Sequence, residues 1–162
     1  MQVIKGKQVE DLYCYKMNFD GGAVPNPGRC AGAYVIYDSD YNVVEEGGKY
    51  IEFGTNNIGE YQGLLCGLRA CSERGIKSLK IKGDSKLVIS QIAKVWKINQ
   101  PELAKIAKEI WELVDQFDFI AMEHVLRNEN KVADKLSDET LDKKKSWIRF
   151  FNKTWTSYKR DR

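Results

Sequence analysis

Four acidic residues stand in four separate and well-marked local settings. Asp20 lies in FDGG, Glu60 in TNNIGEY, Asp84 in KGDS and Asp134 in NENKVAD. Each setting is the end of a predicted strand or the first turns of a predicted helix, so the four carboxylates can converge in space. Converging carboxylates repel one another unless positive charge lies between them. A ligand set made only of oxygen favours Mg²⁺ or Mn²⁺, so the sequence predicts a divalent metal site.

The hydrophobic pattern predicts the elements that must position these acids. Its period is two in the first third of the chain and then alternates between helical and extended segments. We expect strands at 12–20, 31–38, 42–53, 78–83 and 117–126, and helices at 55–74, 85–94, 101–116 and 130–141. Three antiparallel strands followed by strands separated by helices predict an α/β fold. Its core is a mixed five-stranded sheet flanked by helices.

Helix capping is the alternative explanation for some of the acids, because carboxylates favour helix N-termini. Capping alone would account for Asp84, which precedes a short predicted helix, and for Asp134 in the first turn of the last one. It does not account for Asp20, which ends a predicted strand beside two glycines of the loop GGAVPNPG. Nor does it explain why all four settings occur together.

Three glycines recur every four residues in the long predicted helix, at Gly59, Gly63 and Gly67. Each costs about 0.5–1 kcal/mol relative to alanine in a helix interior. The spacing therefore predicts a helix face that lies too close to a neighbouring element to leave room for Cβ atoms.

Four segments together resemble the motif blocks of type 1 ribonuclease H, in the order and spacing of that family. They are FDGGAVPNPGRCAGAYVIY, TNNIGEYQGLLCGL, IKGDSKLVISQI and VLRNENKVADKL, within residues 12–142. The resemblance implies a ribonuclease H domain over 1–145, followed by a basic aromatic tail over 146–162. It also implies hydrolysis of the RNA strand of RNA–DNA hybrids, with 5′-phosphate and 3′-hydroxyl products. Asp20, Glu60, Asp84 and Asp134 would then hold two Mg²⁺ ions, or Mn²⁺ in their place.

The resemblance further implies a set of substrate contacts. The backbone around Asn26 to Gly28, with Gly21 in the same block, would face the nucleic acid. The side chains assigned to the minor groove and the RNA 2′-hydroxyls are Asn56, Asn57 and Gln91, and such contacts distinguish RNA from DNA. Thr55 matches a position that binds a DNA-strand phosphate and is equally suited to cap a helix. Trp96 could stack in the substrate groove or anchor the turn between two helices.

One family feature differs. Many members carry a histidine in a flexible loop before the last helix, whereas here the connection is the short segment RNEN at 127–130. The single histidine, His124, falls within a predicted strand and is interpreted as structural. The chain resembles the archaeal and bacterial subgroup without the histidine loop, in which Arg127 or Glu129 could take over part of the histidine's work.

Composition sets the remaining expectations. No apolar run approaches the ~20 residues of a membrane span, and no signal peptide is evident, so we expect a cytoplasmic protein with reduced cysteines. We also expect a monomer. Residues 143–162 carry eight basic side chains against one acidic, which favours a polyanionic partner. Within the tail, four aromatic side chains share one face of a predicted helix and are expected to pack on the domain: Trp147, Phe151, Trp155 and Tyr158.

Two alternatives of other classes stay open on the sequence. One is an inactive nucleic-acid-binding module of the same fold, which the intact set of four carboxylates argues against. The other is a nuclease of the same fold that acts on double-stranded RNA or on DNA junctions.

Overall fold

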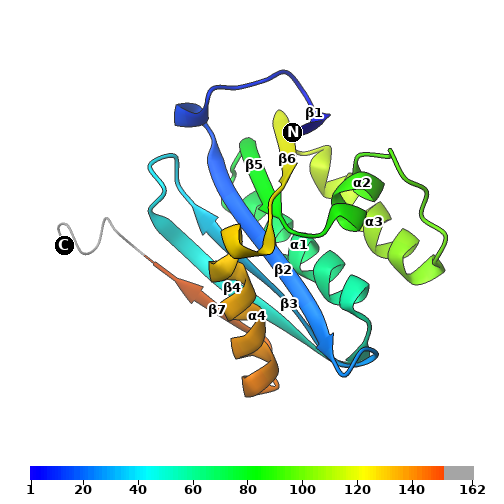
Figure 1. Ribbon diagram of the computed structural model, residues 1–162. Coiled ribbons are helices and arrows are strands. Elements are labelled where there is room, and N and C mark those ends of the chain that lie inside the picture. Colours follow the sequence, from blue (N-terminus) through cyan, green and yellow to red (C-terminus); the bar gives the residue numbers. More distant parts are fainter. Residues whose placement is uncertain (152–162) are drawn as a thin grey trace.

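A mixed seven-stranded sheet organises the protein, which was analysed as a computed structural model that describes residues 1–151 of the 162 (Figure 1). The strands are β1 Gln2–Lys5, β2 Tyr15–Val24, β3 Gly28–Tyr37, β4 Val43–Gly54, β5 Ser78–Gly83, β6 Phe119–His124 and β7 Trp147–Phe150. The helices are α1 Asn56–Glu73, α2 Lys86–Ile92, α3 Pro101–Val114 and α4 Lys131–Lys143, with short 3₁₀ turns η1 Asp11–Tyr13 and η2 Arg127–Glu129.

The order of strands across the sheet is β1-β6-β5-β2-β3-β4-β7. β2, β3 and β4 form an antiparallel meander, while β5 pairs in parallel with both β2 and β6. This confirms the predicted mixed sheet with parallel crossovers. β1 and β7 are additional antiparallel edge strands. Each has four residues, too few for a clear alternation in the sequence.

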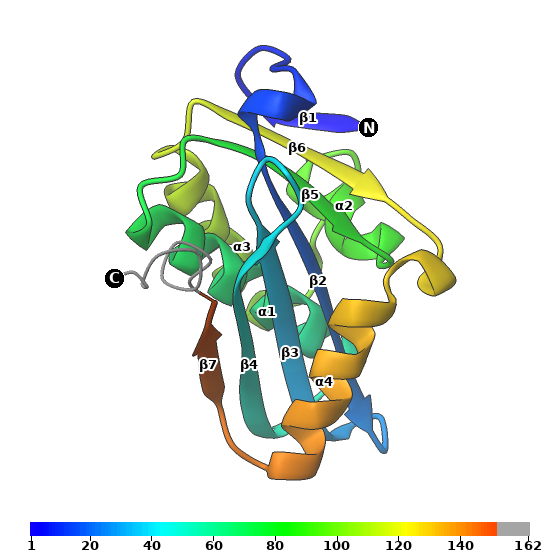
Figure 2. The ribbon, with the colours of Figure 1, turned by 90° about the vertical axis from the view of Figure 1, so that its left-hand side faces the viewer.

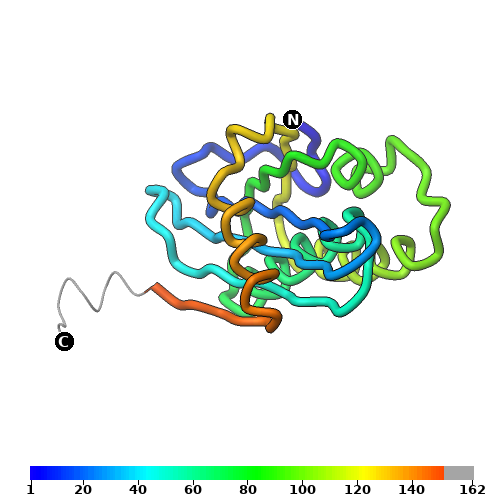
Figure 3. The backbone as a smooth tube through the Cα atoms, turned by 60° about the horizontal axis from the view of Figure 1, so that its bottom comes forward, coloured from blue at the N-terminus to red at the C-terminus, as the bar shows by residue number. Residues whose placement is uncertain are grey.

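Helices cover both faces of the sheet. In Figure 2, α4 lies in front of the sheet and the layer of α1, α2 and α3 lies behind it. The main core fills the space between the sheet and that layer, with Met17, Phe19, Tyr61 and Leu64 fully buried. The tube in Figure 3 follows the chain from β6 through η2 into α4, which packs on β2, β3 and β4.

β2 continues through the two glycines instead of ending at Asp20. Gly21 pairs with Gly32 of β3, and pairing extends to Val24 opposite Arg29. The prediction of a loop from residue 21 was wrong because β3 pairs with β2 as far as Val24, and Pro25 lies beyond the last pair. Asp20 therefore projects from within a central strand.

The glycine spacing in α1 reflects close packing on the sheet, as predicted. A Cβ atom at Gly63 would lie 2.5 Å from the carbonyl oxygen of Asp20, and one at Gly59 would collide with the carbonyl oxygen of Ala31. One at Gly67 would collide with the sulfur of Met17. Backbone atoms cannot move aside, so side chains at the first two positions would push α1 off the sheet.

The neighbouring glycines of β2 provide a matched test of this contact. A Cβ atom at Gly21 would collide with the backbone of Gly59 and Glu60, whereas one at Gly22 would meet only Asn56 Oδ1, at 3.6 Å. We predict that Gly21→Ala lowers the free energy of unfolding by about 1–3 kcal/mol and that Gly22→Ala changes it by less than about 0.5 kcal/mol. Urea denaturation of the two variants measures both values, and equal losses would contradict the account.

β7 attaches the start of the C-terminal segment to the sheet. Trp147 Nε1 donates to Thr140 Oγ1 at 2.9 Å, and Arg149 forms ion pairs with Glu46 and Glu139 at 2.9 and 2.6 Å. The predicted helix through Trp147 is therefore wrong for residues 147–150, which are extended because β4 offers a free edge. The predicted packing positions Trp155 and Tyr158 lie outside the described residues.

Truncation separates β7 from the rest of the tail. We predict that a chain ending at residue 145 loses about 2 kcal/mol or more of unfolding free energy, because strand pairing, Trp147 packing and the Arg149 ion pairs are lost. A chain ending at residue 151 keeps these contacts and should melt close to the full chain. Melting temperatures of the three proteins test this, and Michaelis constants at several salt concentrations test whether the tail also binds substrate.

Two further observations concern the composition. Among residues 1–151, no helix combines the length and the apolar character that crossing a membrane requires. The four cysteines form no disulfide with one another, and Cys14, Cys30 and Cys71 are buried while Cys66 is partly buried.

Candidate active site

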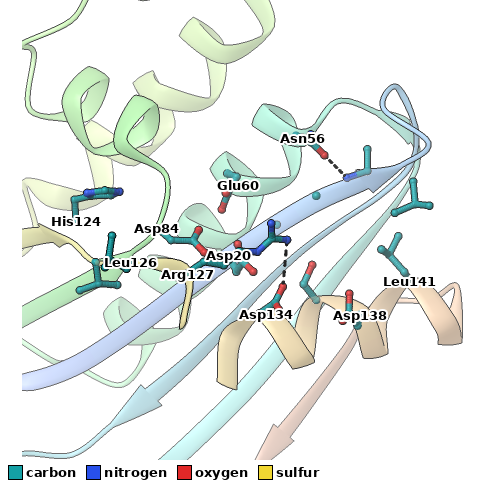
Figure 4. Close-up of a pocket in the computed structure, with 16 residues that line it drawn as sticks. Asp20, Asn56, Glu60, Asp84, His124, Leu126, Arg127, Asp134, Asp138 and Leu141 are labelled. Carbon is teal, nitrogen blue, oxygen red and sulfur yellow. Dashed lines mark hydrogen bonds and ion pairs between the residues drawn. The ribbon is translucent and has the colours of Figure 1, made fainter. Parts of the chain in front are cut away.

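Three of the four predicted carboxylates meet above the centre of the sheet. Asp20 comes from β2, Glu60 from the second turn of α1, and Asp84 from the residue after β5 (Figure 4). One oxygen of each lies within 4.8 Å of the others. Asp134, in the first turn of α4, faces the same cavity of about 470 Å³. The structure thus brings all four acids to one site.

Backbone pairing and one buried amide hold these positions. In the parallel pair β2–β5, Phe19 lies opposite Gly83, so that Asp20 and Asp84 follow on adjacent strands. Asn130, which is 1% exposed, fixes the start of α4 to β2. Its Nδ2 donates to the carbonyl oxygen of Phe19 at 2.9 Å, and its Oδ1 accepts from Asn18 Nδ2 at 3.0 Å. Asp134 lies one helical turn further on, above Asp20.

Capping explains neither Asp84 nor Asp134. The N-cap of α2 is Ser85, whose hydroxyl accepts from the backbone N–H of Val88 at 3.2 Å. α4 begins after Asn130, so Asp134 is its fourth residue and not its cap. Both carboxylates are therefore free to serve the cavity.

The site concentrates negative charge in a partly dry setting. Asp20 is 5% exposed, and burial, followed by the charge of Asp84, raises its pKa. Burial, followed by the charges of Asp20 and Asp84, raises the pKa of Glu60. Glu60 Oε1 is buried without a hydrogen-bond partner. The guanidinium of Arg127 lies 4.0 Å from Asp134, but its side chain is 83% exposed, so its charge is largely screened by water.

These features fit a divalent cation. A buried carboxylate oxygen without a donor is satisfied by a proton or by a cation, and the cluster of Asp20, Glu60 and Asp84 offers only oxygen ligands. Hard oxygen ligands suit Mg²⁺ and Mn²⁺. Cations held by these carboxylates would neutralise and orient a phosphate group that enters the cavity.

We predict that, without metal, the stability of the protein depends on the protonation of Asp20. The pKa of Asp20 is raised to about 8 from 3.8, so the folded protein holds this proton between those pH values and the unfolded chain does not. With EDTA, stability should therefore fall as pH rises across this window, and Asp20→Asn should melt higher than wild type at its upper end.

Millimolar Mg²⁺ should raise the melting temperature of the wild type by about 5–10 °C once its concentration is a hundredfold above Kd. Asp20→Asn should lose most of this rise, and Asp40→Asn, in the exposed turn after β3, should keep it. Calorimetry checks both conditions. A wild-type melting temperature that is the same with EDTA and with Mg²⁺ would contradict the metal site.

Three other predicted residues line the cavity, and three more adjoin it. Gly21, Asn56 and Arg127 lie in the wall. Asn56 Oδ1 accepts from the N–H of Ala23 at 2.7 Å, and the N–H of Asn56 donates to Asn26 Oδ1 at 3.0 Å, which ties the β2–β3 turn to α1. Thr55 is the N-cap of α1, as the capping alternative predicted, with its hydroxyl 3.2 Å from the N–H of Ile58. Asn57 follows in the same helical turn.

The remaining predicted contacts lie outside the cavity. Gly28 is buried at the start of β3, where a Cβ atom would collide with Pro25. Gln91 is 6% exposed, and its amide joins Tyr61 at 2.7 Å and the carbonyl oxygen of Lys97 at 2.9 Å. Both polar atoms of this amide are engaged inside the protein, which argues against the predicted contact of Gln91 with a 2′-hydroxyl. Trp96 is 44% exposed, with the Lys86 ammonium 5.9 Å from its ring centroid.

Two residues of the cavity wall differ from expectation. His124 ends β6 and is exposed at the cavity, so its interpretation as a structural histidine was wrong. Strand alternation placed it correctly in the strand but did not reveal that the strand ends there. Asp138 was not predicted, although it lies one helical turn beyond Asp134 in the same helix, a spacing that the sequence displays.

Comparison with known proteins now identifies the family. A family model described as reverse transcriptase-like matches residues 18–140. The structure of ribonuclease H1 from Halobacterium salinarum superposes with a TM-score of 0.76 and 36% identity, over 80% of this chain and 98% of that one. The chain belongs to the type 1 ribonuclease H family.

Two more relatives agree. The N-terminal ribonuclease H domain of a Mycobacterium tuberculosis protein superposes with a TM-score of 0.78 and 34% identity, over 80% of this chain and 94% of that one. LC11 ribonuclease H1, solved in complex with an RNA/DNA hybrid, gives a TM-score of 0.74 and 29% identity over 80% of this chain and 97% of that one.

Curated full-length relatives are longer than the matched region. The Halobacterium salinarum ribonuclease HI is 38% identical over 124 residues, which is 76% of this chain and 62% of that protein. A bifunctional protein of Mycobacterium tuberculosis is 36% identical over 124 residues, 76% of this chain and 34% of that protein. The chain therefore spans about three fifths and about one third of these relatives.

Proposed function

We propose that this protein is an endoribonuclease that hydrolyses the RNA strand of RNA–DNA hybrids and uses two Mg²⁺ ions, with Mn²⁺ as the alternative metal. The observation that carries the proposal is the set of four carboxylates around one open cavity, with Glu60 Oε1 buried and unpartnered. Membership of the type 1 ribonuclease H family and a relative solved with an RNA/DNA hybrid support the choice of substrate.

The carboxylates have distinct tasks in this proposal. Asp20, from the sheet centre, would contribute to holding both ions, and Glu60, Asp84 and Asp134 would complete their coordination. When bound, the two ions supply an activated water and neutralise charge on the leaving 3′-oxygen. Asp20 and Glu60, whose pKa values burial raises, must be ionised to bind metal, so the four acids together bind cations better as pH rises.

Substrate contacts follow from the neighbourhood of the cavity. Asn56 and Gly21, which line it, are proposed to face the minor groove, and the turn around Asn26 and Gly28 is held beside them by the hydrogen bonds of Asn56. Thr55 keeps its capping role and is also proposed to contact a DNA-strand phosphate.

Three further contacts are proposed on the basis of exposure. Asn57 is partly exposed in the first turn of α1, and Arg127 projects over the carboxylates with a largely exposed side chain that can reach a phosphate. The half-exposed ring of Trp96 could stack on sugar. Gln91 is left out of the substrate set because its amide is engaged inside the protein.

We propose a monomer in the cytoplasm, where the four unpaired cysteines would remain reduced. Light scattering of the purified protein tests the monomer. Cleavage of double-stranded RNA is the alternative activity, and an inactive binding module is the alternative class. Four carboxylates facing one cavity would repel nucleic-acid phosphates, so a pure binding role leaves them without a purpose.

Cleavage of an end-labelled RNA–DNA hybrid tests the proposal. We predict Mg²⁺-dependent cuts in the RNA strand with 5′-phosphate ends. Asp20→Asn should lower the rate by roughly a thousandfold, the upper end of what one preorganised electrostatic group contributes. Asp40→Asn should cleave as the wild type does.

Double-stranded RNA of the same sequence is included in the same assay as the competing substrate. Faster cleavage of that duplex would select the alternative substrate. No cleavage by the wild type with either metal would favour the binding module and refute the enzyme.

A further inference from the structure

Two rows of side chains lead away from the carboxylates along one face of the sheet. The row in β2 is Lys16, Asn18 and Asp20. The row in β5 is Lys80 and Lys82, and it leads to Asp84. The parallel register places Lys16 opposite Lys80 and Asn18 opposite Lys82. Alternate residues share a face and advance by about 7 Å per pair. Lysines therefore lie one and two steps from the acidic site, on the face that carries α4.

The lysines surround a small hollow of about 90 Å³, lined also by Asn18, Tyr41 and Glu123. α4 packs on β2, β3 and β4, and in Figure 2 no helix lies in front of β5 and β6 in the described chain. The side chain of Lys80 is 13% exposed beneath Asp11, and Lys82 is partly buried. The hollow thus lies on the face of the sheet that carries α4, with Asp11 and Tyr41 in its wall.

Lys16 is an unusual member of this group because it is only 4% exposed. Its ammonium donates to the carbonyl oxygens of Asp11 at 2.6 Å and Ser39 at 3.0 Å and lies 4.8 Å from the ring centroid of Tyr41. In the described part of the chain, no carboxylate forms an ion pair with it. A buried cation solvated only by neutral groups favours an anion nearby.

Asp11 is the anion that now faces the lysines. Its carboxylate forms an ion pair with Lys80, while 71% of its side chain stays exposed. The hydrogen bond and charge of Lys80, followed by smaller contributions from Lys16 and Lys82, lower the pKa of Asp11. All three lysines thus attract the carboxylate of Asp11, which belongs to the N-terminal segment.

Glu123 is the second acid of the hollow, opposite Lys82 in the β5–β6 register. It forms no ion pair with Lys82 in the described chain. The hollow therefore has three cations against two carboxylates, and one of these, Asp11, lies on a short exposed turn outside the sheet. Displacing Asp11 would leave the lysines with an excess of two positive charges over Glu123.

We propose that this lysine hollow binds a backbone phosphate of the nucleic-acid strand where it extends beyond the carboxylate cavity, and that Asp11 occupies the position of that phosphate in the free protein. The proposal rests on the proposed function for the identity of the strand. Lys80 and Lys82 contact the phosphate, and Lys16 supplies charge from below. Because the hollow lies along β2 and β5 from Asp20 and Asp84, binding there would hold the strand in register with the cavity.

Separate substitutions of the two partners of one ion pair test the proposal. Lys80→Ala and Asp11→Asn remove the same Lys80–Asp11 pair, so a purely structural role predicts that both act in the same direction. A phosphate site predicts opposite directions: Lys80→Ala weakens hybrid binding, and Asp11→Asn strengthens it because the competing anion is gone. Lys82→Ala should weaken binding, and Lys108→Ala, exposed on α3 behind the sheet, is the charge-matched control.

Binding is measured by fluorescence anisotropy in an Asp20→Asn background with Mg²⁺, so that the hybrid survives, over a series of salt concentrations. Lys80→Ala and Lys82→Ala should each reduce the slope of log affinity against log salt by about 0.7–0.9, the value for one lost phosphate contact. Lys108→Ala should leave the slope unchanged. A hybrid that ends at the cavity should abolish the differences, whereas a longer one should show them.

Equal slopes for Lys80→Ala, Lys82→Ala and Lys108→Ala, or weaker binding by Asp11→Asn, would overturn the phosphate site. That result would leave hybrid cleavage by the wild type intact. Conversely, a wild type that cleaves no hybrid would refute the proposed function, while the salt slopes would still decide the hollow. If inorganic phosphate competes with the hybrid but the length of the hybrid has no effect, the hollow binds only free anions. That result would overturn the strand contact.

Discussion

The contact between α1 and the sheet, in which glycine backbones lie against backbones, is the constraint on which the site depends. Gly21 of β2 and Gly59 of α1 leave no room for a Cβ atom between them. Glu60, the residue after Gly59, is therefore held beside Asp20 although both carry carboxylates. Two such charges about 4 Å apart repel by about 4 kcal/mol at the effective dielectric typical near protein surfaces. Packing and backbone pairing keep the two carboxylates together despite this repulsion.

The other two acids are fixed by equally rigid means. The β2–β5 register places Asp84 next to Asp20, and the buried amide of Asn130 ties α4 to β2 so that Asp134 faces the same point. None of the four acids lies in a long loop. The carboxylates of such a preformed arrangement cannot move apart or into water. Burial, followed by the neighbouring charges, therefore raises the pKa values of Asp20 and Glu60. A divalent cation relieves the repulsion without moving the backbone.

Local patterns could predict the parts of the site that depend on local chemistry. The four carboxylates, the Thr55 cap and the glycine face of α1 each have a signature within a few residues. Features set by distant partners could not be predicted in this way. β2 runs on past Asp20 because β3 pairs with it, and β7 is extended because β4 offers an edge. Gln91 is buried by Tyr61, and His124 reaches the cavity only because β6 ends beside β5.

Anomalous diffraction from crystals soaked in Mn²⁺ would show whether the four carboxylates bind metal ions. We predict two anomalous peaks about 3.5–4 Å apart, with an oxygen of Asp20 between them and the carboxylates of Glu60, Asp84 and Asp134 around them. An empty cavity at saturating Mn²⁺, or ions bound only at other surface carboxylates, would contradict the claim.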